Sequence, residues 1–274
     1  MHSASDHTTH GLLIKAIAQA HSENSIAVLA TLVCAPRDVG AKLLLLETGA
    51  RVGGLRDVAL DEAVARHAPA FIASRASAGI FNVEEFAPLL EGWRGARVLF
   101  ERIEPEPRLV ICGAGHVGAS LAQLARLTGY RTTLIDDRAD FVTRERFPDQ
   151  NIELIAAENW TTALRKTIGK GRGIFVAIVT RGHNEDEECL RVTLAARPDY
   201  IGLIGSKRRT NIVLERLRET GLDEERLREV RAPVGLDIGA VSPEEVALAI
   251  LAEIVAERRG GSGAPLSAWR RSEG

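Results

Sequence analysis

The distribution of apolar and polar positions divides the chain into two parts with different periodicities. In the first part, GLLIKAIAQA (residues 11–20) has the spacing of a helix. DVALDEAVARHAPAFIASRA predicts an amphipathic helix that is interrupted near Pro69, because proline lacks a backbone N–H. Apolar runs that are typical of strands are SIAVLATLVCA, GAKLLLLETG and ARVLFERIEP. This mixture indicates a small α+β domain.

The segment EPEPR, from Glu104 to Arg108, follows that domain. Two prolines among charged residues can continue neither a helix nor a central strand, so the segment is a linker candidate. We therefore expect an N-terminal domain over residues 1–105 and a second domain over residues 106–274.

Beyond the linker, short apolar runs alternate regularly with helical segments. The predicted strands are LVICGAG, RTTLIDD, IELIAA, IFVAIVT and YIGLIGS. The predicted helices cover residues 117–128, 159–168, 184–196 and 207–220, and a last helix opens with Ser242 as N-cap, Pro243 and Glu245 in a capping box. Continuous apolar strands alternating with helices indicate a parallel sheet covered on both faces. The fold class is thus α/β, a Rossmann-like doubly wound sheet with strand order 3-2-1-4-5.

Composition narrows the classes of partner. A net charge of −2 gives no electrostatic basis for binding nucleic acid or an anionic membrane, and 4% aromatic residues offer few stacking platforms. Cys34, Cys112 and Cys189 lie far apart without a CxxC motif, which excludes a disulfide framework and a thiolate zinc site. No apolar run is long enough to span a bilayer. The opening residues MHSASDHTTH lack the pattern of a signal peptide and predict a disordered lead-in. We expect a cytoplasmic protein.

Gly113, Gly115 and Gly118 complete a GxGxxG motif between a predicted strand and helix. Gly113 permits the tight turn, Gly115 lets the backbone approach a phosphate, and Gly118 lets the helix pack against the strand. The alternative is a Rossmann loop that binds nothing. His116 lies inside the loop, and the sequence leaves open whether it contacts a phosphate or only solvent.

Asp136 ends the second strand of this unit, about twenty residues after the first glycine of the motif. An acid at this place can hold ribose hydroxyls, and it favours NAD over NADP.

Two more loops follow strands at the same edge of the predicted sheet. In VTRGHNEDEE, Thr180, Arg181 and His183 can reach the ligand crevice, whereas the acids that follow favour simple stabilisation of a helix start. In IGLIGSKRRTN, three cations, Lys207, Arg208 and Arg209, stand in the first turn of a helix, where the helix dipole disfavours them. Either an anion binds the Gly205–Ser206 turn beside them, or their side chains extend into water.

The chain carries no recognisable catalytic constellation. GxSxG, HExxH and P-loop motifs are missing from the sequence. After the Rossmann core only a helix and a tail remain, so the sequence provides no evident acid or base beside a nicotinamide. An NAD-dependent oxidoreductase and a nucleotide-sensing regulatory domain stay as alternative functions.

The ordered motifs VICGAGHVGASLA, VTRGHNEDEECL, YIGLIGSKRR and APVGLDIGAVSPEEVALAILAEIVA resemble the XdhC/CoxI family, the xanthine dehydrogenase accessory factors. The resemblance implies a maturation factor, not itself an enzyme, that binds the molybdenum cofactor (molybdopterin) and helps to deliver it to a molybdenum hydroxylase. The implied partners are a xanthine dehydrogenase or carbon monoxide dehydrogenase-like client and a cofactor sulfurase, and a homodimer is left open. No protein residue is assigned to a metal. The residues that the resemblance carries over to the cofactor are Gly113, Gly115, His116, Gly118, Arg181, Gly182, His183, Gly205, Ser206 and Lys207.

The N-terminal part departs from that family. Many relatives have a glycine-rich segment with a cysteine, where this chain reads VGGLRDVALDE. A second cysteine motif before the linker is also missing between residues 78 and 95. If a thiolate in these segments binds molybdenum in relatives, this chain lacks it, and Cys34 is the only N-terminal substitute, at another place in the sequence. Two alternatives follow: weaker cofactor binding, or binding that a partner mediates.

Overall fold

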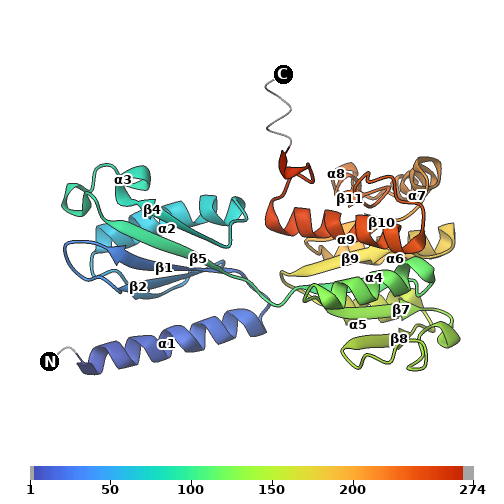
Figure 1. Cartoon of the computed structure of the whole chain (residues 1–274), viewed down its shortest axis with the longest axis horizontal. Coiled ribbons are helices and arrows are strands. Elements are labelled where there is room, and N and C mark those ends of the chain that lie inside the picture. Colours follow the sequence, from blue (N-terminus) through green and yellow to red (C-terminus); the bar gives the residue numbers. More distant parts are fainter. Residues whose placement is uncertain (1–2, 268–274) are drawn as a thin grey trace, which may run out of the picture. The chain divides into compact units, whose positions relative to one another are not determined.

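The computed structural model describes residues 3–267, which divide into two compact units between Pro105 and Glu106 (Figure 1). We refer to them as the N-terminal and the C-terminal unit and describe each by itself. Among the described residues, no helix combines the length and the apolar character that crossing a membrane requires.

An antiparallel sheet of strand order β3-β2-β1-β5-β4 forms the centre of the N-terminal unit. The three apolar runs of the sequence become β1, β2 and β5, whereas β3 and β4 were not predicted. The strands are β1 (Ala27–Cys34), β2 (Lys42–Leu46), β3 (Arg51–Gly54), β4 (Ala78–Asn82) and β5 (Arg97–Ile103).

Helices cover both faces of this sheet (Figure 1). On one face, α1 (Ser3–Ser22) packs Leu13 and Ala20 against the strands. On the other, α2 (Val58–Ala73) forms a core with α3 (Val83–Phe86) and the 3₁₀ turn η1 (Glu91–Trp93).

Two local predictions were wrong in this unit. The lead-in is helical from Ser3 onward, because extending a helix that Leu13 already anchors adds hydrogen bonds without a new nucleation step. The second helix continues through Pro69, because burial of Ala68 and Phe71 on the sheet outweighs the hydrogen bond that proline removes.

The C-terminal unit has a parallel sheet of strand order β11-β10-β9-β6-β7-β8. Counted from the first strand of this unit, the order is the predicted 3-2-1-4-5 with one further strand at the edge, so the Rossmann-like α/β prediction is confirmed. The strands are β6 (Arg108–Cys112), β7 (Arg131–Asp136), β8 (Ile152–Ala156), β9 (Ile174–Ile178), β10 (Tyr200–Leu203) and β11 (Val230–Arg231).

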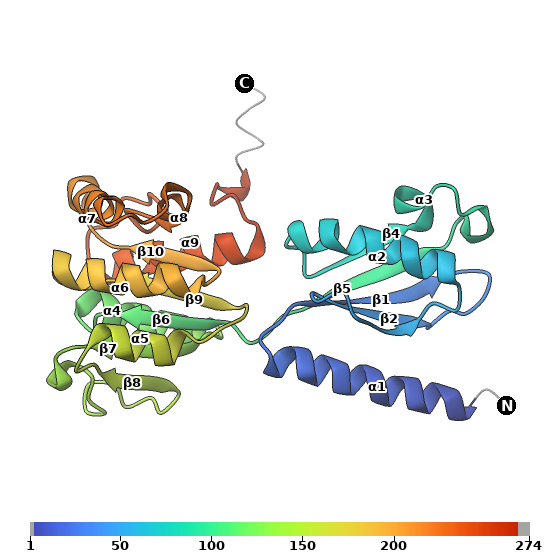
Figure 2. The ribbon, with the colours of Figure 1, turned by 180° about the vertical axis from the view of Figure 1, so that it is seen from behind.

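Helices lie on both faces of the parallel sheet, as Figures 1 and 2 show from opposite sides. One face is covered by α4 (His116–Leu127) and α9 (Pro243–Arg259). The other is covered by α5 (Trp160–Ile168), α6 (His183–Ala196), α7 (Lys207–Glu219) and α8 (Glu224–Arg228). A 3₁₀ turn, η2 (Ala139–Phe141), follows β7. The predicted capping box of Ser242 and Glu245 is confirmed.

Candidate functional site

The first and fourth strands of the Rossmann unit, β6 and β9, lie side by side, and their following helices, α4 and α6, pack on opposite faces. The order of the sheet reverses at this point, and open α/β sheets bind ligands in the crevice beyond the carboxyl ends of such strands. The candidate site is therefore the set of loops that leave β6, β7, β9 and β10 at this edge.

Two glycines of the GxGxxG loop are required by close packing. Gly113 has φ of +113°, and a Cβ atom there would lie 2.6 Å from the carbonyl oxygen of Val179. A Cβ atom on Gly118 would lie 1.8 Å from the carbonyl oxygen of Gly113. Gly115 differs, because nothing lies within 4 Å of its hypothetical Cβ. The loop thus packs tightly against β9 and leaves open space at the glycine that was expected to face a phosphate.

The helices that flank the crevice begin without a side-chain cap. The N-cap residues are Gly115 for α4 and Gly182 for α6, so no capping side chain accepts a hydrogen bond from the first N–H groups of either helix. The other helices of the described C-terminal unit each have a capping oxygen, on Asn159, Ser206, Asp223 and Ser242. Uncapped backbone N–H groups and the positive end of the helix dipole together attract anions.

Both histidines of the predicted site are the first helical residues after these glycines. His116 is exposed at the start of α4, and His183 is half-buried at the start of α6. The Nδ1 atom of His183 is buried and has no hydrogen-bond partner among the described residues. Each imidazole therefore stands at a helix end that favours a negative ligand.

Asp136 has a different role from the one the sequence indicated. Its side chain is buried, and Oδ2 accepts a hydrogen bond of 2.7 Å from the backbone N–H of Ala114. Arg138 donates from its backbone N–H and Nε to Oδ1 and from Nη2 to Oδ2. Burial alone would raise the pKa of Asp136, but these hydrogen bonds and the guanidinium charge lower it to about 2. The carboxylate expected to bind ribose instead ties the glycine loop to β7.

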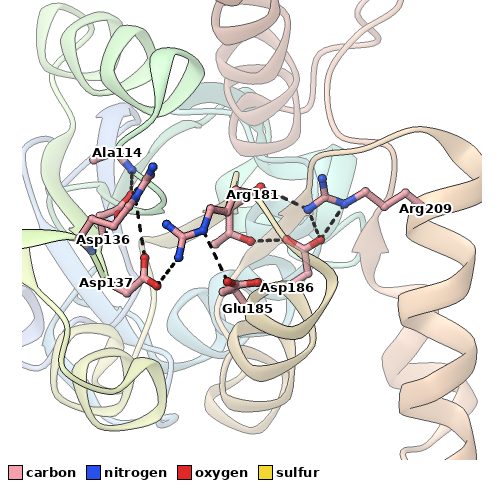
Figure 3. A network of polar contacts seen from close by, with 9 residues as sticks. Ala114, Asp136, Asp137, Arg181, Glu185, Asp186 and Arg209 are labelled. Atoms are coloured by element: carbon pink, nitrogen blue, oxygen red, sulfur yellow. Dashed lines mark hydrogen bonds and ion pairs between the residues drawn. The ribbon is translucent and has the colours of Figure 1, made fainter. Parts of the chain in front are cut away.

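Arg181 lies on the loop after β9, within reach of the acid that follows Asp136. Its guanidinium pairs with Asp137 at 3.0 Å and with Glu185 at 3.7 Å, and about half of its side chain is exposed (Figure 3). Surface ion pairs of this kind contribute little to stability and exchange partners readily. The guanidinium of Arg181 therefore lies at the predicted crevice, in ion pairs that it can give up for a ligand.

A buried ion pair between Asp186 and Arg209 joins the segments that follow β9 and β10. The carboxylate of Asp186 accepts hydrogen bonds from the hydroxyl of Thr180 and from Arg209, whose Nη2 lies 2.6 Å away (Figure 3). Burial raises the pKa of Asp186, and the hydrogen bonds from Thr180 and Arg209 oppose that rise. Arg209 also donates to the carbonyl oxygen of Thr180 at 3.3 Å. These contacts fix the loops after β9 and β10 against each other.

The Gly205–Ser206 turn differs from the glycine loop. The hydroxyl of Ser206 accepts a hydrogen bond from the backbone N–H of Arg209, so α7 has its own cap. Arg209 faces Asp186 and does not serve a bound anion. Lys207 and Arg208 are exposed, and neither has an ion-pair partner within residues 3–267. This turn can supply cations to a ligand but holds fewer free backbone donors.

The structure thus brings the predicted residues to one edge of one sheet. Gly113, Gly115, His116, Gly118, Asp136, Arg181, Gly182 and His183 follow β6, β7 and β9, and Gly205, Ser206 and Lys207 follow the neighbouring β10. The sequence interpretation missed the Asp186–Arg209 pair and the Asp136–Arg138 pair. For Asp186 and Arg209, the available signal was an acid and an arginine in segments that meet once the strand order is known, whereas Asp136 and Arg138 lie two residues apart in the sequence.

Comparisons with known proteins agree with this fold. The model of the XdhC Rossmann domain matches residues 109–254, and that of the XdhC and CoxI family matches residues 20–86. A crystal structure of a protein described as a xanthine dehydrogenase from Bacillus halodurans has a TM-score of 0.50 and 19% identity. The match covers 93% of this chain and 98% of the Bacillus halodurans chain. At this level of identity the similarity supports the fold alone.

Curated relatives share part of their length with this chain. The uncharacterized protein YqeB of Escherichia coli is 36% identical over 57% of this chain and 28% of its own length. A probable xanthine dehydrogenase component of Bacillus subtilis is 31% identical over 59% of this chain and 46% of its own length. The molybdenum cofactor insertion chaperone PaoD of Escherichia coli is 29% identical, over 56% and 41%. The chain spans less than half the length of these relatives.

The family model of the Rossmann domain covers more than half of the chain, and it includes every loop of the candidate site. The chain therefore belongs to the XdhC and CoxI family, with an XdhC Rossmann domain as its C-terminal unit.

Proposed function

We propose that this protein is an accessory factor that binds the molybdenum cofactor and transfers it to a molybdenum hydroxylase. Membership of the XdhC and CoxI family supports a maturation role. So does the similarity to a probable xanthine dehydrogenase component and to PaoD, which is named as a molybdenum cofactor insertion chaperone. The client class is a xanthine dehydrogenase or a carbon monoxide dehydrogenase-like enzyme, and a cofactor sulfurase is a further proposed partner.

The observation that carries this proposal is the pair of uncapped helix starts at the reversal point of the sheet. The pterin of the molybdenum cofactor ends in a phosphate, which needs several convergent donors. The first backbone N–H groups of α4 and α6 have no capping side chain, so they can donate to an anion. The space around Gly115 admits such an anion, whereas at Gly182 the carboxylate of Glu185 lies close by and would have to move. His116, His183 and the exposed Lys207 can add charge-assisted hydrogen bonds.

The protein's part in transfer is to hold and release the cofactor. The tight packing at Gly113 and Gly118 keeps the loop rigid, so binding needs little ordering of the backbone. Arg181 can leave Asp137 for a ligand oxygen and return, because an exposed ion pair exchanges at small cost. Such a site favours reversible binding, as a carrier requires.

An NAD-dependent oxidoreductase is supported less well. That function needs a free acid after β7 for the ribose hydroxyls, and Asp136 already accepts hydrogen bonds from Ala114 and Arg138. Asp137 is the more exposed neighbour, but it faces Arg181. A nucleotide-sensing regulatory domain would share the glycine loop, so ligand identity must separate these functions.

Anaerobic equilibrium binding of isolated molybdenum cofactor tests the proposal, with NAD and NADH titrated in parallel. Bound molybdenum and pterin are quantified after gel filtration. The proposal predicts near-stoichiometric cofactor, weak binding of NAD, and weaker cofactor binding when His116 or Lys207 is replaced by alanine. Saturable NAD binding without cofactor binding would overturn it in favour of the nucleotide-based alternatives.

A further inference from the structure

Arg146 is a firmly held cation at the edge of the glycine loop. It is exposed in the segment between β7 and β8, yet its guanidinium has fixed neighbours. Nη1 donates to the carbonyl oxygen of Phe141 at 2.8 Å, and Nη2 donates to that of Ala114 at 3.4 Å. Its Cζ atom lies 4.6 Å from the ring centre of Phe141 and 5.6 Å from that of Phe147, which is buried in the core. These contacts orient the guanidinium before any ligand binds.

The charge of Arg146 is not neutralised by an acid of this unit. Among the described residues, its hydrogen bonds go to backbone carbonyl oxygens, and no carboxylate forms an ion pair with it. The other arginines of these loops differ, because Arg138 pairs with Asp136 and Arg181 pairs with Asp137. The two carbonyl oxygens use only some of the N–H groups of a guanidinium. Since the side chain is exposed, the remaining donors can reach an acceptor from outside the chain.

The position of Arg146 relative to the glycine loop indicates which acceptor this is. Ala114, which it contacts, immediately precedes Gly115, the N-cap of α4. In dinucleotide-binding folds, a glycine loop of this kind holds a diphosphate at the helix start, and the nucleoside half of the ligand lies beside the loop after the second strand. The second strand here is β7, and the segment after it supplies Arg146. The guanidinium therefore lies on the nucleoside side of the glycine loop.

We propose that Arg146 binds the second phosphate of a diphosphate, so that the site prefers a cofactor extended by a nucleotide to one that ends in a single phosphate. This inference rests on the proposed function and specifies the form of the cofactor. One phosphate accepts hydrogen bonds from the first backbone N–H groups of α4, and the other accepts them from Arg146. A single phosphate at the helix start leaves Arg146 without an anionic partner, so it gains less.

Recognition of the nucleotide through its phosphate also fits the neighbouring acid. Asp136 is buried and already accepts hydrogen bonds from Arg138 and from the backbone N–H of Ala114. It is therefore not free to hold ribose hydroxyls, which is the usual contact at this place in a dinucleotide-binding fold. The exposed guanidinium of Arg146 provides the contact to the extended ligand instead.

Anaerobic equilibrium binding of two forms of the cofactor to the full chain tests the inference. One probe is molybdenum cofactor that ends in a phosphate, and the other is molybdenum cofactor extended by cytidine monophosphate through a diphosphate. The natural protein is expected to bind the extended form at least about tenfold more tightly, as one charge-assisted contact to a phosphate allows. Arg146→Gln is expected to remove most of this preference, while binding of the shorter form changes by about twofold or less.

Arg144→Gln is the matched control. Arg144 is exposed in the same segment and also donates to a backbone carbonyl oxygen, that of Asp149 at 2.9 Å. Its replacement should leave the ratio of the two affinities unchanged. That ratio separates ligand binding from a structural role, because a glycine loop loosened by the loss of Arg146 would weaken both forms alike. Urea denaturation of each variant checks that the protein is folded.

Each other outcome overturns the inference in a recognisable way. Equal binding of both forms by the natural protein would exclude the diphosphate preference and leave the proposed function intact. A preference that survives in Arg146→Gln, or a variant that loses both forms equally, would show that this arginine does not bind the second phosphate. If neither form binds to the natural protein, the proposed function fails and this inference fails with it.

Discussion

The loops after β6 and β10 both looked like anion sites in the sequence, yet the structure gives them opposite character. After β6, Gly115 starts α4 with no side-chain cap and with open space around it. After β10, Ser206 caps α7 with its own hydroxyl, and the nearby Arg209 is paired with buried Asp186. A helix start can therefore bind an anion only where the protein leaves the first backbone N–H groups without an acceptor of its own.

The largest expected effect on stability comes from disrupting the close packing of Gly118 in the glycine loop after β6. Gly118→Ala places a methyl group against the carbonyl oxygen of Gly113, so the turn or the helix must shift. We expect a loss of about 3 kcal/mol in the free energy of unfolding, measured by urea denaturation. Gly115→Ala is the matched control within the same motif, and its cost should stay at about 1 kcal/mol or less. Equal costs would contradict the packing account.

The second prediction concerns the buried ion pair between Asp186 and Arg209. Asp186→Asn removes the charge that faces Arg209 and is expected to cost about 2–3 kcal/mol in unfolding free energy. The neighbouring acid, Glu185, provides the control, because its ion pair with Arg181 is long, at 3.7 Å, and lies near solvent. Glu185→Gln should change stability by about 0.5 kcal/mol or less. If both substitutions cost the same, the buried pair does not fix the loops.

The pH dependence of stability reports on Asp136. Its pKa is about 2 in the folded protein, below the ordinary value of 3.8, so ionisation of this group stabilises the fold above pH 4. That contribution, about 2 kcal/mol, is lost as the pH falls from about 4 to 2. The difference in unfolding free energy between the natural protein and Asp136→Asn should therefore shrink over this interval. A difference that is independent of pH would show that the carboxylate charge does not hold the glycine loop.

Much of the fold followed from local patterns, whereas the polar contacts of the site did not. Apolar strands alternating with helices predicted the parallel sheet, and Ser242 and Glu245 predicted the start of α9, because both signals lie within one element. Asp136 was assigned to a ligand, and Arg209 was left between an anion and solvent, because their protein partners could not be seen in the sequence. Arg209 meets Asp186 only when α6 and α7 pack on the same face of the sheet.

The N-terminal unit shows the same limit on a smaller scale. Pro69 looked like an interruption because the local rule considers one helix alone, yet Ala68 and Phe71 hold that helix on the sheet. The edge strands β3 (RVGG) and β4 (AGIFN) were missed because glycine interrupts each of them and neither has a continuous apolar run.

The smallest expected effect on stability carries the most direct test of the proposed binding site. Gly115→Asp gives α4 the side-chain cap that α7 has, at a position with an extended backbone and room for a side chain. A capping aspartate should leave the free energy of unfolding unchanged or raise it by a few tenths of a kcal/mol. It also places a negative charge where the phosphate of the cofactor would bind.

The measurement to make is therefore paired: anaerobic binding of molybdenum cofactor and urea denaturation, on the natural protein and on Gly115→Asp. The account predicts near-stoichiometric cofactor on the natural protein, at least about tenfold weaker binding by the variant, and no loss of stability in the variant. Cofactor binding that is unchanged by Gly115→Asp would contradict the claim that the uncapped start of α4 is the binding site.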